Sequence, residues 1–300
     1  MTDICKYKLL SPKSAGESED LVAEKSVEEG QRRIQALLAD WLRMENVVVL
    51  TAAGCSVGAG GRLMAGPVSS NLECLVLDVV EQCPISADAR ALISWKRKND
   101  FGKGNFEDWL SYLFNASGIT KPVHSPIKAV TWKGEVAATD GGTKEPEPSE
   151  ADAEALRGYI EKAIFAECAL ELDRKEVTGG TGSVSSGHIP FLAKLIARDT
   201  NLGRTHLFTL NYDTLFEQAM EELGIQYFDG FSGKANSRFD PAVYGLDVYY
   251  PGDVAEGRVR RFDKFLQFYK LHGSIHWSID ADGAYRARHI GLNFSAVRAF

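Results

Sequence analysis

Two spacings of apolar residues recur along the chain, and together they predict an α/β protein. Residues 46–51 form a continuous apolar and β-branched run, which is typical of a strand buried on both faces of a parallel sheet. Similar runs predict strands at 205–210 and 265–271, and a short one at 225–228. Apolar residues three and four positions apart predict helices between these strands. This strand–helix alternation favours a Rossmann-like, doubly wound parallel sheet.

Capping residues locate several of the expected helices. Ser26 with Glu29 forms a capping box ahead of a helix over 27–44. Ser149 is the expected N-cap of a helix that ends near residue 173. Further helices are expected at 67–82, 87–98, 105–116 and 188–199, and from the residues after 213 up to 223.

The predicted helices between the first two strands are too many for one crossover connection, which indicates an insertion. We therefore expect a Rossmann-like domain made of 26–66 and 188–300, with a helical subdomain inserted at 67–187. Alternating residues around 282–283 predict a hairpin near the end of this domain. Residues 1–25 are polar and are expected to form a flexible tail.

Composition narrows the class of protein. The chain has 300 residues, of which 44% are hydrophobic and 25% are charged, as in a soluble globular protein. Its net charge of −7 argues against direct nucleic-acid binding, because that affinity comes from neutralising phosphates. The purest apolar run, 47–53, is far short of the roughly 20 residues that cross a bilayer, so no membrane span is expected.

The number and spacing of the cysteines argue against a domain stabilised by disulfides and against one stabilised by zinc. The chain has five cysteines, an odd number, and no pair has C-x-x-C spacing. This pattern argues against a disulfide framework and against a zinc ribbon built on four cysteines. The N-terminus has no apolar signal-peptide core, so the expected compartment is the reducing cytoplasm.

Three of the predicted strands end in polar or very small residues. They are followed by Ala-Ala-Gly-Cys-Ser at 52–56, Asn-Tyr-Asp at 211–213 and His-Gly-Ser at 272–274. Ligands of open α/β sheets bind at the carboxyl ends of the strands, so we expect these segments to form one site. Together they could supply a backbone cradle for phosphate, an amide with a carboxylate, and an imidazole.

These segments carry a resemblance to a known family. LTAAGCS resembles the GAGxS loop of sirtuin-type (silent information regulator two) NAD-binding domains, TLNYD resembles their T-x-N-x-D motif, and LHGS resembles their catalytic His-Gly. The order of the motifs fits the family, including a helical insertion between the first two. FEDWL at 106–110 and the aromatic residue after LHGS also look like the sirtuin-like proteins of bacterial antiphage defence.

The sequence departs from the family pattern at four places. Ala52 replaces the first glycine of GAGxS, and VGAGGRLMAG follows Ser56 where protein deacylases have GIPDFR. The zinc-binding C-x-x-C pairs are absent, so no metal is expected. Because deacylases use these features around an acyl-lysine peptide, their loss suggests that NAD itself is the substrate. The family also has further strands after the His-Gly, so the sheet is expected to be incomplete.

The resemblance assigns a role to each residue of the expected site. His272 would act as general base, and Asn211 would hold a ribose hydroxyl or the attacking water. Asp213 would accept hydrogen bonds from ribose or from the protein, and backbone N–H groups of 53–56 would bind pyrophosphate at a helix N-terminus. The expected NAD-binding residues are Ala52, Ala53, Gly54, Cys55, Ser56, Asn211, Asp213, Gly273 and Ser274.

The lead hypothesis is an NAD+ glycohydrolase that forms nicotinamide and ADP-ribose and depletes NAD in antiphage defence. The resemblance implies a homo-oligomer, activated by a HerA-type ATPase or by a phage-derived trigger. Two alternatives stay open: a non-catalytic module that senses NAD or ADP-ribose, and an NAD-dependent protein deacylase, which the missing zinc cysteines disfavour. Asp213 could also be only a helix N-cap, and His272 a structural histidine.

Overall fold

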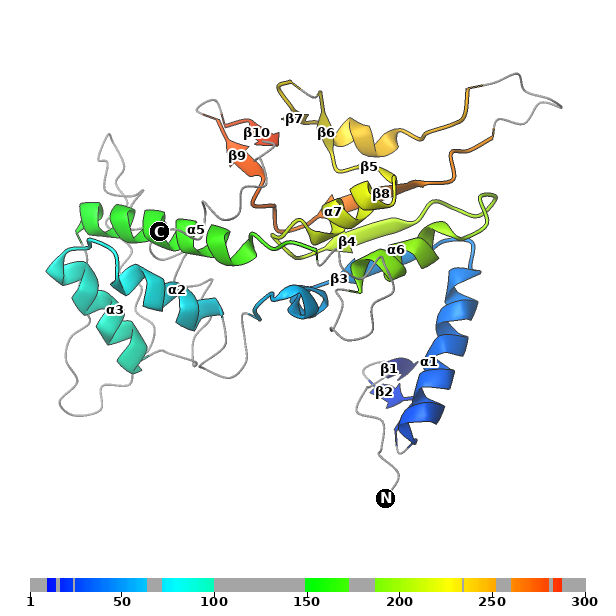
Figure 1. The fold of residues 1–300 in the computed structure, drawn as a ribbon, viewed down its shortest axis with the longest axis horizontal. Coiled ribbons are helices and arrows are strands. Elements are labelled where there is room, and N and C mark those ends of the chain that lie inside the picture. Colours follow the sequence, from blue (N-terminus) through cyan, green and yellow to red (C-terminus); the bar gives the residue numbers. More distant parts are fainter. Residues whose placement is uncertain are drawn as a thin grey trace.

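A four-stranded parallel sheet, in the order β3-β4-β8-β5, lies at the centre of the computed structural model (Figure 1). Its strands are β3 (Val48–Thr51), β4 (His206–Thr209), β8 (Phe265–Lys270) and β5 (Gln226–Phe228). The structure describes residues 10–14, 17–23, 25–63, 72–99, 149–172, 187–233, 235–251, 260–280 and 283–287. The parallel sheet and its helices confirm the predicted α/β, Rossmann-like fold class.

The register of the sheet brings the ends of three strands into one row. Thr51 pairs with Thr209 across β3 and β4, and Thr209 pairs with Lys270 across β4 and β8. Backbone hydrogen bonds continue this alignment by one residue, because the N–H of Leu210 donates to the Thr51 carbonyl at 3.0 Å, and the N–H of Leu271 donates to the Thr209 carbonyl at 3.0 Å. The loops that follow the three strands therefore start at the same edge of the sheet.

Two helices cover one face of the sheet. They are α6 (His188–Ile196) and α7 (Leu215–Glu222), which contact each other and share a hydrophobic core with the strands. Alternate residues of the strands point toward these helices, as expected from the two-residue period of a strand. The buried core of this layer comprises Leu192, Leu195, Leu207, Leu215, Phe216, Ala219, Met220, Leu266 and Phe268.

The expectation that the first strand is buried on both faces is wrong. β3 lies at the edge of the sheet, and Val48 and Leu50 are 67% and 64% exposed. Val49, on the other face, packs against the helical layer. On the same side of the sheet as Val48 and Leu50, Phe208 stacks on Tyr269 with ring centroids 4.2 Å apart. Apolar composition alone cannot reveal this, because an edge strand with one open face and a central strand can have the same sequence pattern.

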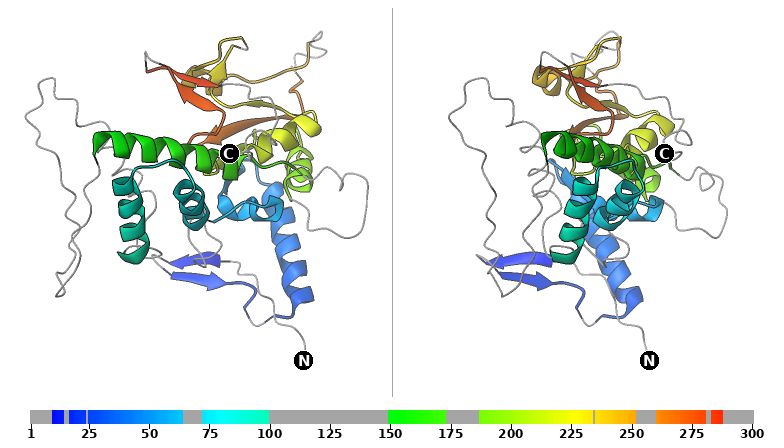
Figure 2. Two further views of the ribbon diagram at one scale, coloured as in Figure 1. Left: turned by 60° about the vertical axis from the view of Figure 1, so that its left-hand side comes forward. Right: turned by 90° about the vertical axis from the view of Figure 1, so that its left-hand side faces the viewer.

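Three helices form a second hydrophobic core beside the sheet. α2 (Leu72–Glu81), α3 (Ala87–Asn99) and α5 (Glu150–Cys168) lie together to one side of the strands in Figures 1 and 2. Their buried residues are Leu72, Val76, Leu77, Val80, Ala89, Leu92, Ile93, Ala153, Leu156, Ile160 and Ala163. Ser149 caps α5, since its hydroxyl accepts from the Asp152 N–H at 3.2 Å. The helix expected at 105–116 and the FEDWL segment lie outside the described residues.

The N-terminal part differs from the expected flexible tail. Within residues 1–25, β1 (Leu10–Ser14) and β2 (Glu17–Asp20) form an antiparallel pair. The capped helix follows as α1 (Val27–Leu42), and the Ser26 hydroxyl accepts from the Glu29 N–H at 3.3 Å. Polar composition concealed the strands, because a mostly polar sequence has no apolar alternation to identify a strand.

Short antiparallel strands pack together in space beyond the carboxyl end of β8. They are β6 (Phe231–Ser232), β7 (Arg238–Phe239), β9 (Trp277–Ile279) and β10 (Tyr285–Ala287), and β9 with β10 forms the expected hairpin. Trp277 contacts Phe231 and Phe239, with ring centroids 5.1 and 6.3 Å away. These contacts hold β9, the strand that follows His272, against β6 and β7. Among the described residues, no helix is long and apolar enough to cross a membrane.

Candidate active site

The loops that follow β3, β4 and β8 line one cavity of about 210 Å³. Six of the predicted site residues reach it, namely Ala52, Ala53, Ser56, Asn211, Asp213 and His272. Gly54, Cys55, Gly273 and Ser274 belong to the same loops but do not line this cavity. The three segments thus meet as expected, because parallel strands that end in one row deliver their loops to one edge of the sheet.

The loop after β3 forms two 3₁₀ turns, where the sequence predicted the N-terminus of a helix. They are η1 (Ala53–Cys55) and η2 (Val57–Ala59). In η1 the N–H groups of Cys55 and Ser56 already donate to the carbonyls of Ala52 and Ala53, at 3.0 and 3.1 Å. The N–H groups of Ala53 and Gly54 have no partner among the described residues, so they are the donors of this loop that a phosphate could engage.

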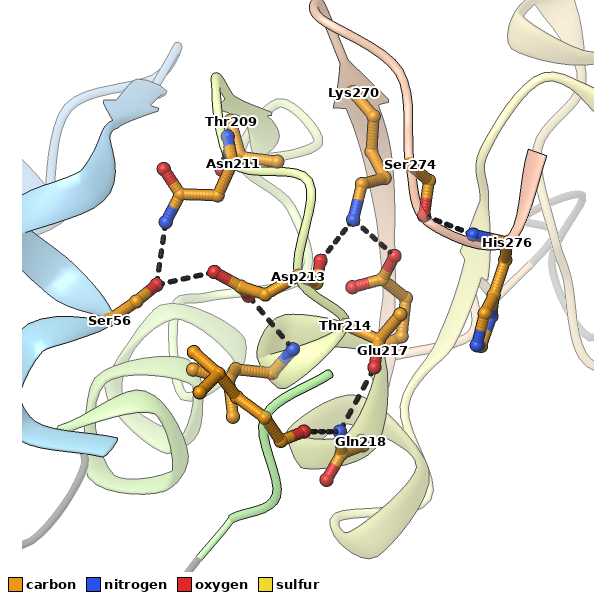
Figure 3. A network of polar contacts seen from close by, with 12 residues as sticks. Ser56, Thr209, Asn211, Asp213, Thr214, Glu217, Gln218, Lys270, Ser274 and His276 are labelled. Atoms are coloured by element: carbon orange, nitrogen blue, oxygen red, sulfur yellow. Dashed lines mark hydrogen bonds and ion pairs between the residues drawn. The ribbon is translucent and has the colours of Figure 1, made fainter. Parts of the chain in front are cut away.

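A buried network joins the loop after β3 to the loop after β4 (Figure 3). The Asn211 amide nitrogen donates to the Ser56 hydroxyl at 2.7 Å, and this hydroxyl donates to Oδ2 of Asp213 at 2.6 Å. Oδ1 of Asp213 accepts from the Leu215 N–H at 3.1 Å, at the start of α7. Both carboxylate oxygens of Asp213 are therefore engaged by the protein, which supports a structural role for this residue.

The Asn211 side chain presents its oxygen rather than its nitrogen to a ligand. Its Nδ2 donates to Ser56 and, at 3.3 Å, to the sulfur of Cys55. No described residue donates to its Oδ1, and the side chain lines the cavity. An amide oxygen held in this way can accept a hydrogen bond from a ribose hydroxyl or from a water molecule.

His272 follows the end of β8 and lies at the boundary between two cavities. Its exposed imidazole borders the 210 Å³ cavity and a second cavity of about 520 Å³, which is lined largely by aromatic side chains. No described residue hydrogen-bonds to its ring, whose centroid is 6.4 Å from that of Tyr212. An exposed imidazole beside a cavity is placed to accept a hydrogen bond or a proton from a bound molecule.

Two predicted binding residues shape the backbone after His272. Gly273 has a φ of 90°, a left-handed conformation that glycine adopts with little strain, and the chain turns sharply there. The Ser274 hydroxyl accepts from the His276 N–H at 3.3 Å, so it stabilises the same turn. Both residues thus have a local structural function in the His-Gly-Ser segment.

Several residues of the cavity were not predicted as site residues. Arg62 supplies a cationic side chain to the lining, and Glu167 and Cys168 reach it from the end of α5. Gly61 also lines it, and a Cβ at this position would lie 2.7 Å from the Cβ of Ser56. The glycine-rich stretch after Ser56 was the available signal for Gly61 and Arg62. Nothing in the spacing of α5 indicated that its C-terminal end lies over the cavity.

The two cysteines near the cavity have properties of packing residues. Burial raises the pKa of the Cys55 thiol above its ordinary value. Burial raises the pKa of Cys168 to about 12, and the carboxylate of Asp213 adds to that shift. Because the thiolate is the nucleophilic form, neither sulfur is activated for catalysis at neutral pH.

A buried histidine next to this site makes stability depend on pH. His188 is 2% exposed, packs edge-on against Phe216 at 4.6 Å, and neither ring nitrogen has a hydrogen-bond partner in the described part of the chain. Burial lowers the pKa of His188, so the folded protein favours the neutral ring. This contribution to stability is complete above the ordinary histidine pKa of roughly 6.5 and is lost as the pH falls through the folded value.

We expect His188→Leu to make stability less sensitive to acid. The wild-type free energy of unfolding should fall between pH 7.5 and about pH 5, and the variant should show a shallower fall because it has no imidazole to protonate. Urea unfolding of both proteins at several pH values measures the difference. Equal slopes for the two proteins would contradict the prediction.

Comparison with known families agrees with this geometry. Residues 205–288, which run from the start of β4 to the final hairpin, match the family model of the SIR2-like domain. This part of the chain is therefore similar to a SIR2-like domain. SIR2-like domains belong to a class of enzymes that use NAD, so the match indicates an NAD-related function for the cavity. The matched segment contains Asn211, Asp213 and His272. A search of curated proteins finds no match to the chain.

Within the described ranges, no group of three or more His, Cys, Asp or Glu side chains could hold a metal ion. The residues that line the cavity suit a nucleotide better. They include Ala53, whose N–H has no partner among the described residues, together with Arg62, an amide oxygen and an imidazole.

Proposed function

We propose that this chain is an NAD+ glycohydrolase, which cleaves NAD+ to nicotinamide and ADP-ribose. The observation that carries the proposal is that Asn211 and His272, from different strand ends, line the same cavity as the loop after β3. A site that only senses NAD requires neither an unpaired amide oxygen nor an exposed imidazole at the same cavity.

The loop after β3 would hold the pyrophosphate of NAD. Ala53 lines the cavity, and its N–H, which has no partner among the described residues, can donate to a phosphate oxygen; Arg62 adds a positive charge. Ser56 is buried in the network with Asn211 and Asp213, so it positions the loop instead of contacting the ligand. These contacts bind substrate and transition state alike, so they contribute mainly to affinity.

Asn211 and His272 would carry out the chemical step. The bond between nicotinamide and C1′ of ribose breaks, and its electron pair leaves with the nicotinamide nitrogen. Oδ1 of Asn211 would accept a hydrogen bond from the water that attacks C1′, and His272 would take the proton of that water. The products are nicotinamide, ADP-ribose and one proton, and no residue becomes covalently modified.

Hydrolysis of NAD is favoured over deacylation by what the sequence lacks. The C-x-x-C pairs and the GIPDFR segment, which the resemblance associates with an acyl-lysine peptide, are absent. We further propose that the activity depletes cytoplasmic NAD during antiphage defence. In this role the chain would act as a homo-oligomer, and a HerA-type ATPase or a phage-derived molecule would switch it on.

Product analysis tests the proposed reaction. Purified protein with NAD is expected to release nicotinamide and ADP-ribose in equal amounts, and to leave acyl-lysine peptides unchanged because the acyl-lysine features are missing. Chromatography of both products, with and without an acetylated peptide, makes the measurement. Peptide deacylation coupled to NAD use would identify a deacylase, and binding of NAD without turnover would identify a sensor.

A further inference from the structure

A buried ion pair lies beneath the loop that carries Asn211. Lys270 is the last residue of β8, and its side chain is 2% exposed. Its ammonium lies 2.8 Å from Oε1 of Glu217 on α7, whose side chain is 14% exposed. The same ammonium donates a hydrogen bond to the backbone carbonyl of Asp213 (Figure 3).

This ion pair is a costly way to stabilise a fold. Removing two charges from water carries a desolvation penalty, and well-packed apolar residues in their place are often as stable or more stable. Burial raises the pKa of the Glu217 carboxyl, an effect that the positive charge of Lys270 opposes. The second carboxylate oxygen of Glu217 has no hydrogen-bond partner within the described residues. Stability alone therefore does not explain why charges occupy this position.

The hydrogen bonds and position of the Lys270 ammonium explain better why charged residues lie here. Lys270 is two residues before His272, and it is in register with Thr209, which is two residues before Asn211. Its hydrogen bond to the Asp213 carbonyl crosses from β8 to the loop after β4. Asp213 in turn accepts from Ser56 on the loop after β3. One cation thus links the three loops that form the cavity.

We propose that Lys270, held in place by Glu217, is a positioning residue that sets Asn211 relative to His272. The proposal rests on the NAD+ glycohydrolase function, because it concerns the geometry of that reaction. Lys270 acts through the Asp213 carbonyl and does not itself touch the reacting atoms. When that bond is lost, the Asn211 loop shifts relative to His272, and a displacement of about 1 Å costs on the order of 10²-fold in rate.

The double variant Lys270→Met/Glu217→Leu separates positioning from stability. It removes both charges together, so no unpaired buried charge remains and the protein is expected to fold. We expect kcat for nicotinamide release to fall about 10–100-fold, with a smaller change in KM, because the pyrophosphate donors on the loop after β3 are retained. The melting temperature is measured on the same samples.

Two further variants complete the experiment. Arg204→Met/Asp247→Leu removes a partly buried ion pair of similar length, 2.7 Å, away from the cavity, and should leave kcat unchanged. Glu217→Gln keeps an oxygen that can accept from the ammonium but removes the negative charge, so an intermediate kcat is expected. It also tests the proposal if the double variant does not fold.

Each outcome separates this inference from the proposed function. If the double variant folds and keeps the wild-type kcat, the ion pair is purely structural and the inference is wrong. If the double variant does not fold, a wild-type kcat in Glu217→Gln leads to the same conclusion. An equal loss of kcat in the Arg204→Met/Asp247→Leu protein would also overturn the inference. If wild-type protein released no nicotinamide, the proposed function would fail first, and this inference with it.

Discussion

His272→Ala is expected to lower the rate of nicotinamide release by roughly 10²–10⁴-fold, the usual contribution of a general base. The imidazole is exposed and borders the cavity, so its removal deletes the proton acceptor while little packing is lost. The melting temperature should therefore stay close to that of wild type. Steady-state NAD consumption and thermal unfolding, measured on the same preparation, check both parts of the prediction.

His276→Ala provides the matched control for this experiment. His276 follows the same turn, but it does not line the cavity, so its removal should leave NAD consumption near the wild-type rate. Near-normal turnover in a folded His272→Ala protein would contradict the role of His272 as base. In that case the structural interpretation of this histidine would be the correct one.

Asn211→Ala should reduce turnover to a similar extent, for a different reason. Oδ1 of Asn211 is the atom that would orient the attacking water or a ribose hydroxyl, and alanine has no acceptor to replace it. The change also removes the hydrogen bond from Nδ2 to Ser56, which should cost about 1 kcal/mol of stability. NAD consumption and urea unfolding measure the two effects separately.

Ser56→Ala distinguishes the chemical role of Asn211 from its structural one. This variant loses the same buried network but retains Oδ1 of Asn211 at the cavity. We expect a clearly smaller loss of turnover than in Asn211→Ala. If both variants lost the same activity, Asn211 would act only by holding the loops together.

The part of the site that follows strand ends could be predicted from the sequence. Each motif comes directly after an apolar run, and parallel strands expose their carboxyl ends at one edge of a sheet. The structure adds the reason that these three ends are so close. Thr51, Thr209 and Lys270 occupy one row of the ladder, so the loops begin level with one another.

Other features depend on tertiary contacts that no local pattern encodes. Lys270 was part of an apolar strand pattern, and only the structure shows that its ammonium meets Glu217 and the Asp213 carbonyl. The end of α5, which packs with α2 and α3, reaches the cavity although about a hundred residues separate it from the loop after β3. The exposed face of β3 likewise follows from its place at the edge of the sheet.

In the proposed reaction, water activated beside His272 and Asn211 cleaves NAD. The most direct test is to run the reaction in heavy-oxygen water and to analyse the products by mass spectrometry. We expect ADP-ribose that carries one labelled oxygen at C1′, together with an equal amount of nicotinamide, and almost none of either from His272→Ala. Intact NAD after incubation with the wild-type protein, or ADP-ribose transferred to another acceptor without label, would contradict it.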